Sequence, residues 1–322
     1  MWHIKVPATA ANLGSGFDAL GLALSLSLDV WFSEAPQLSI AVRGEGHGLV
    51  PEGPDNVVWR TAARLYEEVC QRPIPTGRLT IKSRIPLGRG LGSSAAAIVA
   101  GLTLANTLMP KRLGRDELLA RASQIEGHPD NVSAAIYGGF VMAWHEGETL
   151  RVQNYPAPDL RCLILVPDYR VSTEDARRVL PETVPLQDAV FNAQRLALWI
   201  DAVNHRDWSL LPHAAEDRLH QPYRQSLIPG MQALIDAALS HGAAFSSLSG
   251  SGPTILSLVP SERALDVAEA LTQVAAEVIP GRFQLHDVTP SAFGAECVLD
   301  GWQWRGGAGH RRRIERGPVT RP

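Results

Sequence analysis

Hydrophobic and polar residues alternate in several short segments of this chain, and the alternation predicts β-strands. In residues 22–30, leucines and a valine occupy every second position, with small or polar residues between them. This pattern is typical of a strand that buries one face. Residues 79–85 alternate less strictly, whereas 162–166 are apolar throughout and predict a buried strand. Residues 282–288 predict one more strand.

Helix-forming runs lie between these strands. Residues 95–108 predict a helix that ends before Pro110, and residues 115–126 predict another that ends at Gly127. Pro129 stands where a new helix could begin. Later helices are expected over 186–204, 231–241 and 261–278, with a strand, a loop and a strand around 249–252. The mixture predicts two layers of helices and strands that share a cleft.

The proline pair in residues 156–159 predicts the boundary between two units, because prolines interrupt regular elements. We expect an N-terminal domain over 1–155, a C-terminal domain over 156–300 and a basic tail over 301–322. From Arg305 onward the tail is rich in arginine and has no apolar periodicity. Such a composition cannot bury a core, so we expect the tail to be disordered.

Composition favours a soluble globular protein. The chain has 322 residues, of which 45% are hydrophobic and 20% are charged, enough for a substantial core. Its formal net charge of −3 argues against a nucleic-acid partner, which would require a basic face. The sequence has no apolar run long enough for a membrane span or a signal peptide. The cysteines are few and widely spaced, which favours a reducing, cytoplasmic location: Cys70, Cys162 and Cys297.

Residues 86–97, Pro-Leu-Gly-Arg-Gly-Leu-Gly-Ser-Ser-Ala-Ala-Ala, join a predicted strand to a predicted helix. Glycines let backbone N–H groups approach an anion, and a helix N-terminus adds unpaired donors. The segment therefore predicts a phosphate-binding loop. It lacks the lysine of a Walker loop and does not fit the dinucleotide fingerprint. Residues 14–19 fit the pattern GxGxxA, but they lead into an alternating strand and not into a helix, which argues against a dinucleotide site.

The glycine-rich segment resembles the phosphate-binding motif of the GHMP kinase superfamily, named for galactokinase, homoserine kinase, mevalonate kinase and phosphomevalonate kinase. Other segments agree: residues 6–21, 126–132 and 172–177 resemble homoserine kinase segments, and 247–254 resembles the third superfamily motif. The resemblance runs from about residue 4 to about residue 300. It implies an α+β fold of two domains, the N-terminal one similar to ribosomal protein S5 domain 2 and the C-terminal one ferredoxin-like.

The resemblance implies ATP and Mg²⁺ as cofactors. The implied ATP-binding residues belong to the two glycine loops, and they are Pro86, Leu87, Gly88, Arg89, Gly90, Leu91, Gly92, Ser93, Ser94, Ala95, Ala96, Ser249, Gly250 and Gly252. Mg²⁺ prefers oxygen ligands and often keeps waters, so one hydroxyl and one carboxylate are a sufficient protein contribution. By resemblance these ligands are Ser94 and Glu126. Arg89 stands at a variable position of the loop, where it could contact phosphate or face solvent.

The resemblance implies L-homoserine, a small zwitterion, as the phosphoryl acceptor. Arginine suits a carboxylate because its donors form a planar fork, and Arg177 and Arg224 are the candidates for this role. Asp18 would pair with the ammonium group. The implied substrate-binding residues are Asn12, Asp18, His128, Thr173, Arg177 and Arg224, and the implied catalytic residues are Ser94, Glu126 and Asn131.

The source of the rate enhancement is a separate question. Some GHMP kinases use an aspartate as general base, whereas homoserine kinases resemble a variant without a dedicated base. Asp130 is therefore a weak candidate for a base, with helix N-terminal charge and hydrogen bonding as its alternative role. We expect positioning and electrostatic stabilisation to supply most of the rate, with Asn131 helping to stabilise the transferred group.

The function predicted is ATP-dependent phosphorylation of L-homoserine to O-phospho-L-homoserine, for threonine synthesis. One alternative is another small-molecule GHMP kinase, such as a mevalonate-pathway enzyme. Another is a nucleotide-binding regulator that has lost phosphoryl transfer. Residues 12–18 with Arg177 and Arg224 favour an amino-acid acceptor, whereas Ser94 and Glu126 argue against lost transfer. A homodimer is considered as well, and no nucleic-acid or membrane partner is expected.

Overall fold

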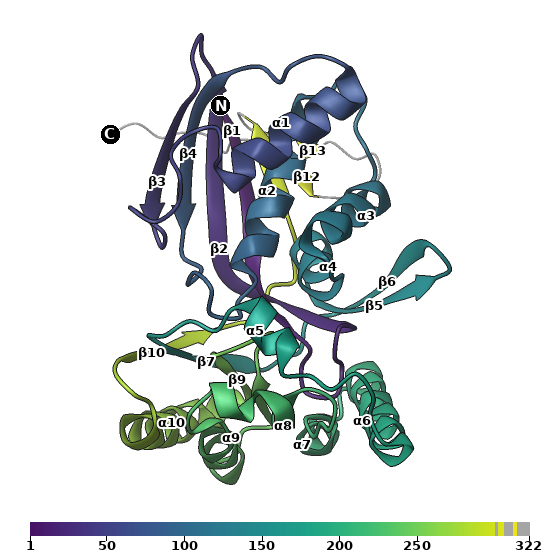
Figure 1. The fold of residues 1–322 in the computed structure, drawn as a ribbon, viewed down its shortest axis with the longest axis vertical. Helices are drawn as coiled ribbons and strands as arrows, with labels where there is room; N and C mark the ends of the chain where they lie inside the picture. The colour runs from purple at the N-terminus through teal and green to yellow at the C-terminus, as the bar shows by residue number, and fades with distance from the viewer. Residues whose placement is uncertain (300–301, 306–311, 314–322) are drawn as a thin grey trace.

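Two β-sheets organise the molecule, of which this computed structural model describes residues 1–299, 302–305 and 312–313. The larger sheet has nine strands, which include β1 (Trp2–Ala11), β2 (Leu20–Glu34), β3 (Ser39–Gly44), β4 (Gly77–Ser83), β5 (Phe140–Glu146) and β6 (Thr149–Tyr155). Helices α1 (Val57–Cys70), α2 (Ser93–Leu108), α3 (Arg115–Glu126) and α4 (Asp130–Tyr137) lie beside this sheet (Figure 1).

Strands β1 and β2 form the centre of the larger sheet and pair antiparallel. Every second residue of β2 points into the core, so the leucines and the valine of the predicted strand 22–30 are largely buried. The register between the two strands shifts after Pro7, which cannot donate a backbone hydrogen bond. Beyond this irregularity β1 continues to Ala11. Thr9 donates its N–H to the carbonyl of Leu91 in the loop of residues 86–92, which we call the glycine loop. The central strand thus supports the loop directly.

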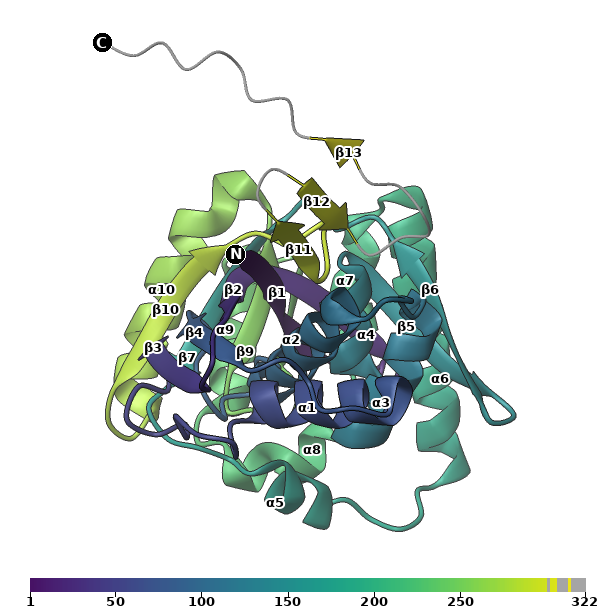
Figure 2. The ribbon, with the colours of Figure 1, turned by 90° about the horizontal axis from the view of Figure 1, so that it is seen from above.

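The C-terminal part of the described chain returns to the larger sheet. Strand β11 (Glu296–Leu299) pairs with β1, followed by β12 (Trp302–Arg305) and β13 (Arg312–Arg313) (Figure 2). This pairing differs from the expectation that residues up to 300 belong with the C-terminal domain and that a disordered tail begins at 301. Pairing between strands so distant in sequence leaves no local periodic signal. The rest of the predicted tail lies outside the described residues, and the division at residue 155 stays a prediction.

The smaller sheet has the strand order β10-β7-β9-β8. Its strands are β7 (Arg161–Pro167), β8 (Phe245–Leu248), β9 (Ile255–Val259) and β10 (Phe283–Val288). Helices α9 (Met231–Ser240) and α10 (Ala264–Val278) pack on one face, where Leu163 and Leu165 join their apolar residues. The alternate residues Cys162 and Ile164 join the core of the larger sheet. Both faces of β7 are therefore buried, as its apolar sequence predicts.

Further helices lie in the chain between β7 and α9. They are α5 (Thr173–Arg178), α6 (Leu186–His205), α7 (Leu211–Ala214) and α8 (Gln221–Arg224), and Figure 1 shows α5 near the junction of the two sheets. The helices predicted over 95–108, 115–126 and 186–204 are confirmed to within a few residues. Helix α1 was not predicted. Among the described residues, none of the helices combines the length and the apolar character needed to cross a membrane.

Candidate active site

A pocket of about 180 Å³, open to solvent, lies where the glycine loop meets the segment after β1 and helices α5 and α8. The residues that line it are Asn12, Asp18, Gly88, Gly90, Gly92, Ser93, Ser94, Glu126, His128, Asp130, Asn131, Val171, Ser172, Thr173, Arg177, Arg224, Gly250 and Ser251. All of the predicted substrate-binding, catalytic and metal-binding residues are in this set. Segments far apart in the sequence thus meet in one pocket.

The glycine loop forms one wall of the pocket, directly before α2. Gly88, Gly90 and Gly92 all have φ values in the left-handed region, at 64°, 78° and 66°. A Cβ atom at Gly90 would lie 2.2 Å from the carbonyl oxygen of Ser249, so only glycine fits there. In the part of the chain that the structure describes, no side chain caps the N-terminus of α2. The first N–H groups of this helix are therefore available to an anion such as a phosphate.

Hydrogen bonds join the glycine loop, the third motif (residues 247–254) and the end of β1. The Ser249 hydroxyl donates to the carbonyl of Gly90, at 2.7 Å. Gly250 donates its N–H to the carbonyl of Ala11, and its own carbonyl accepts from Nδ2 of Asn12, both at 3.0 Å. These contacts fix the glycine loop and the third motif against the end of β1. A change in any one of the three segments will disturb the other two.

Ser94 and Glu126 bring two oxygen atoms together beside the glycine loop. The Ser94 hydroxyl, in the first turn of α2, donates to Oε2 of Glu126, at the end of α3, over 2.9 Å. Burial raises the pKa of Glu126, and the hydrogen bond from Ser94 opposes this shift. One hydroxyl and one carboxylate fit Mg²⁺, which takes its remaining ligands from phosphates and water. In the described part of the chain, His, Cys, Asp and Glu side chains form no cluster of three or more that could hold a metal.

Asp130, at the start of α4, organises its neighbours. Its side chain is buried, and Oδ1 accepts hydrogen bonds from Nδ1 of His128 at 2.8 Å and from the Asn131 N–H at 2.6 Å. The hydrogen bond with Asp130 raises the pKa of His128. The hydroxyl of Thr9 donates to Oδ1 of Asn131 over 2.7 Å, which leaves Nδ2 as the donor of that amide. Thr9 was not predicted as a site residue, although it lies within the motif 6–21.

Asp18 and Arg177 form a bidentate ion pair across the pocket. Nη1 and Nη2 of Arg177 donate to the two carboxylate oxygens of Asp18 over 3.1 and 2.9 Å. This hydrogen bonding raises the pKa of Arg177 further above its ordinary value. The sequence assigned the two residues to opposite groups of the substrate. In the structure they pair with each other.

Arg224 is a buried cation without an ion pair among the described residues. Its residue is only 2% exposed. Nε donates to the carbonyl of Ala176, and Nη1 donates to the carbonyl of Gly250 and to Nδ1 of His220. Burial lowers the pKa of Arg224 to about 10. Since these acceptors are neutral, the positive charge lining the pocket is left without a contacting anion, and an anionic ligand would relieve this.

Some predicted ATP-binding residues support the loop from outside the pocket. Leu91, Ala95, Ala96 and Ser249 are buried, whereas Pro86, Leu87 and Arg89 line a neighbouring cavity. Arg89 neither enters the pocket nor faces solvent. Its guanidinium donates to the Pro167 carbonyl and forms an ion pair of 3.1 Å with Asp168. Arg89 therefore ties the glycine loop to the end of β7.

Comparisons with known proteins agree with this geometry. The family models described as "GHMP kinases N terminal domain" and "GHMP kinases C terminal" match residues 56–139 and 199–277. The glycine loop and the helix α2 that follows it lie in the first match. The fold and the pocket thus define a GHMP kinase, a small-molecule kinase of α+β architecture, and the α+β, two-domain fold class expected from the resemblance is confirmed.

Similar proteins of known name identify the family within the GHMP kinases. The chain is 43% identical over 272 residues to homoserine kinase of Desulfitobacterium hafniense, covering 84% of this chain and 91% of the relative. It is 44% identical to homoserine kinase of Gloeobacter violaceus, covering 86% and 92%. A crystal structure of homoserine kinase from Cytophaga hutchinsonii superposes with a TM-score of 0.81 at 30% identity, covering 92% and 96%. This chain belongs to the homoserine kinase family.

Proposed function

We propose that this chain transfers the γ-phosphoryl group of ATP to the hydroxyl group of L-homoserine and gives O-phospho-L-homoserine, a step of threonine synthesis. The observation that carries the proposal is the buried guanidinium of Arg224 in the pocket beside the glycine loop, which has no ion pair among the described residues. A substrate carboxylate supplies the anion that this cation lacks. The relatives named homoserine kinase support the choice of amino acid.

The ion pair of Asp18 with Arg177 separates an amino-acid acceptor from a mevalonate-type acceptor. A zwitterion offers an ammonium group to Asp18 and a carboxylate to Arg177 and Arg224. Asp18 then pairs with the ammonium group in place of Arg177, and Arg177 pairs with the carboxylate in place of Asp18. No charge is left unpaired. Mevalonate has a carboxylate but no ammonium group, so it offers no cation to Asp18. The pocket therefore favours the amino acid.

The phosphate side of the pocket accounts for the second substrate. We propose that the N–H groups at the start of α2 and in the glycine loop bind the phosphates of ATP, with Ser94 and Glu126 as ligands of Mg²⁺. When bound, Mg²⁺ neutralises the charge that builds up between the β- and γ-phosphates. The complete loop and this oxygen pair also argue against a regulator that has lost phosphoryl transfer.

Positioning supplies most of the rate in this proposal. The hydroxyl oxygen of homoserine bonds to the γ-phosphorus as the bond to the β–γ bridging oxygen breaks; ADP leaves with that oxygen, and the hydroxyl proton passes to an oxygen of the transferred phosphoryl group. Oδ1 of Asp130 already accepts hydrogen bonds from Nδ1 of His128 over 2.8 Å and from Nδ2 of Asn131 over 3.3 Å, so we assign Asp130 to orienting these two side chains and not to proton abstraction. The hydrogen bond from Thr9 to Oδ1 fixes the orientation of the Asn131 amide, and Nδ2 donates one hydrogen to Asp130. In this proposal the second hydrogen of Nδ2 is donated to the transferred group.

A cytoplasmic location and a homodimer, both considered from the sequence, stay proposals. The three cysteines are free in the described residues, which is in keeping with a reducing compartment.

Arg224→Leu tests the substrate assignment. We expect KM for L-homoserine to rise about ten- to a hundredfold, the range for loss of one hydrogen-bonded charge, with KM for ATP unchanged. L-Homoserine amide, whose carboxylate is replaced by a neutral group, should be a poor substrate for the wild type but should lose little further on the variant. Arg178→Leu on α5 is the control, because Arg178 pairs with Glu174 and Asp175 at the surface. If the wild type and Arg224→Leu discriminate equally against the amide, Arg224 does not bind the carboxylate.

A further inference from the structure

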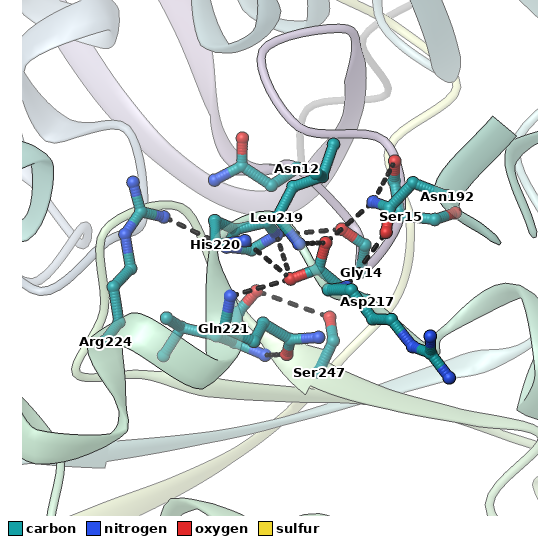
Figure 3. Close-up of polar contacts among 12 residues, drawn as sticks. Asn12, Gly14, Ser15, Asn192, Asp217, Leu219, His220, Gln221, Arg224 and Ser247 are labelled. Carbon is teal, nitrogen blue, oxygen red and sulfur yellow. Dashed lines mark hydrogen bonds and ion pairs between the residues drawn. The ribbon is translucent and has the colours of Figure 1, made fainter. Parts of the chain in front are cut away.

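His220 lies between Arg224 and the loop that follows β1. It is fully buried, and its ring stacks on Phe17 with a centroid distance of 5.1 Å. Nε2 of His220 lies 2.8 Å from the carbonyl oxygen of Gly14, and Nδ1 lies 3.1 Å from Nη1 of Arg224. Figure 3 shows His220 between the loop and the arginine. Neither the sequence motifs nor the proposed mechanism gives this histidine a role.

The two contacts define the tautomer of His220. A carbonyl oxygen can only accept, so Nε2 carries a hydrogen and donates it to Gly14. An arginine nitrogen can only donate, so Nδ1 is unprotonated and accepts from Arg224. Both contacts are satisfied together only when the imidazole is neutral. A protonated ring would direct a second N–H group against Nη1 of Arg224.

The surroundings of His220 both lower and raise its pKa. Burial lowers the pKa of His220 most strongly, the charge of Arg224 lowers it further, and Asp217 and Asp18 oppose the shift. Burial is the largest effect, so the ring is neutral at neutral pH. This state is the one that the two hydrogen bonds require.

Asp217 holds the backbone of His220 in place. Its side chain is fully buried, Oδ2 accepts the N–H groups of His220 and Gln221 at 3.0 and 2.7 Å, and Oδ1 accepts the N–H of Leu219 at 2.9 Å. Nδ2 of Asn192 donates to Oδ1 as well, over 2.8 Å (Figure 3). The start of α8 is thereby fixed, and with it the point from which the imidazole extends.

We propose that His220 is a positioning residue for the substrate carboxylate: as an acceptor for Nη1 it fixes the guanidinium of Arg224, and as a donor to Gly14 it couples that guanidinium to the loop bearing Asp18. The proposal rests on the proposed function, in which Arg224 binds the carboxylate. With Nε and Nη1 committed to protein acceptors, Nη2 is the end of the fork that is left for the substrate. The two groups that bind the ends of the zwitterion are thus held at a fixed separation.

Three substitutions of His220 distinguish the positioning of Arg224 from a role in core packing alone. His220→Leu removes both hydrogen bonds, and we expect KM for L-homoserine to rise about tenfold, as for loss of one bond to a charged group, with KM for ATP unchanged. His220→Asn keeps an acceptor near the position of Nδ1 but loses the donor to Gly14, so its KM should rise less than that of the leucine variant. His220→Gln places a donor near the position of Nε2 and should behave like the leucine variant. His205→Leu, on the exposed end of α6, is the control.

A double-mutant cycle tests whether His220 acts through Arg224. In the Arg224→Leu background, His220→Leu should cause no further rise in KM for L-homoserine, because the contact that it removes is already absent. Additive effects would overturn the proposal, as would equal KM values for the asparagine and glutamine variants. If the leucine variant fails to fold, the asparagine and glutamine variants decide the matter by themselves. If Arg224→Leu alone leaves KM unchanged, the proposed function fails and not only the role of His220.

Discussion

Glu126→Gln should lower kcat for phosphoryl transfer at least about a thousandfold, because a bound metal ion contributes several kcal/mol of transition-state stabilisation. The substitution keeps the size of the side chain and its position near Ser94, but removes the negative charge that Mg²⁺ requires. The apparent affinity for Mg²⁺, followed by titration in the presence of ATP, should fall with kcat. The melting temperature should change little, since Glu126 is only partly buried and has no ion pair with arginine or lysine among the described residues.

Glu269→Gln is the matched control for Glu126. Glu269 is an exposed glutamate on α10 and does not line the pocket. Its substitution should leave kcat and the Mg²⁺ titration unchanged. A Glu126→Gln enzyme that retains a kcat within about tenfold of the wild type, a loss of only about 1.4 kcal/mol, would remove Glu126 from the metal site.

Gly90→Ala should cause the second large loss, a weakening of ATP binding by at least about tenfold, because a residue with a side chain at this positive φ is strained by about 1–3 kcal/mol. The Cβ atom would also meet the backbone of the third motif, 2.2 Å from the oxygen of Ser249 and 2.9 Å from the nitrogen of Gly252. Neither group can move without disturbing the hydrogen bond from Ser249 to Gly90. ATP affinity can be measured by calorimetry.

Gly147→Ala is the control that distinguishes backbone strain at a positive φ from the steric clash of a Cβ atom with the third motif. Gly147 also has a positive φ, of 60°, but apart from its own chain neighbours no atom of the described residues lies within 4 Å of the position its Cβ would take. This variant should lose some stability and bind ATP like the wild type. If both alanine variants bind ATP equally well, the contact between the glycine loop and the third motif does not control the nucleotide site.

Local sequence signals predicted the elements that carry the phosphate loop. Helix α3 begins and ends where its sequence predicts, since Gly127 follows it in a left-handed conformation that glycine adopts without strain. The buried strand β7 was predicted by its uninterrupted apolar run. Helix α1 was missed, although Asn56 accepts a hydrogen bond from the Val58 N–H and caps its start. That capping signal was present in the sequence.

The candidate residues could be predicted from the motifs, but their contacts could not. Asp18 and Arg177 lie 159 positions apart and pair with each other, which no spacing within either segment indicates. His220 lies four residues before Arg224, a spacing that places side chains on one face of a helical turn and could have pointed to their contact. Its second partner, Gly14, is 206 positions away and comes only from the fold. Strand β11 likewise finds its place on β1 only through long-range pairing.

The identity of the acceptor is tested most directly by product analysis. The purified chain is incubated with ATP, Mg²⁺ and, in separate reactions, L-homoserine, L-homoserine amide and mevalonate, and the phosphorylated products are identified by ³¹P NMR and mass spectrometry. We expect O-phospho-L-homoserine, with kcat/KM for L-homoserine exceeding that for either other acceptor by at least about tenfold, the worth of one charged hydrogen bond. A higher kcat/KM for mevalonate, or ATP hydrolysis without a phosphorylated amino acid, would contradict the account.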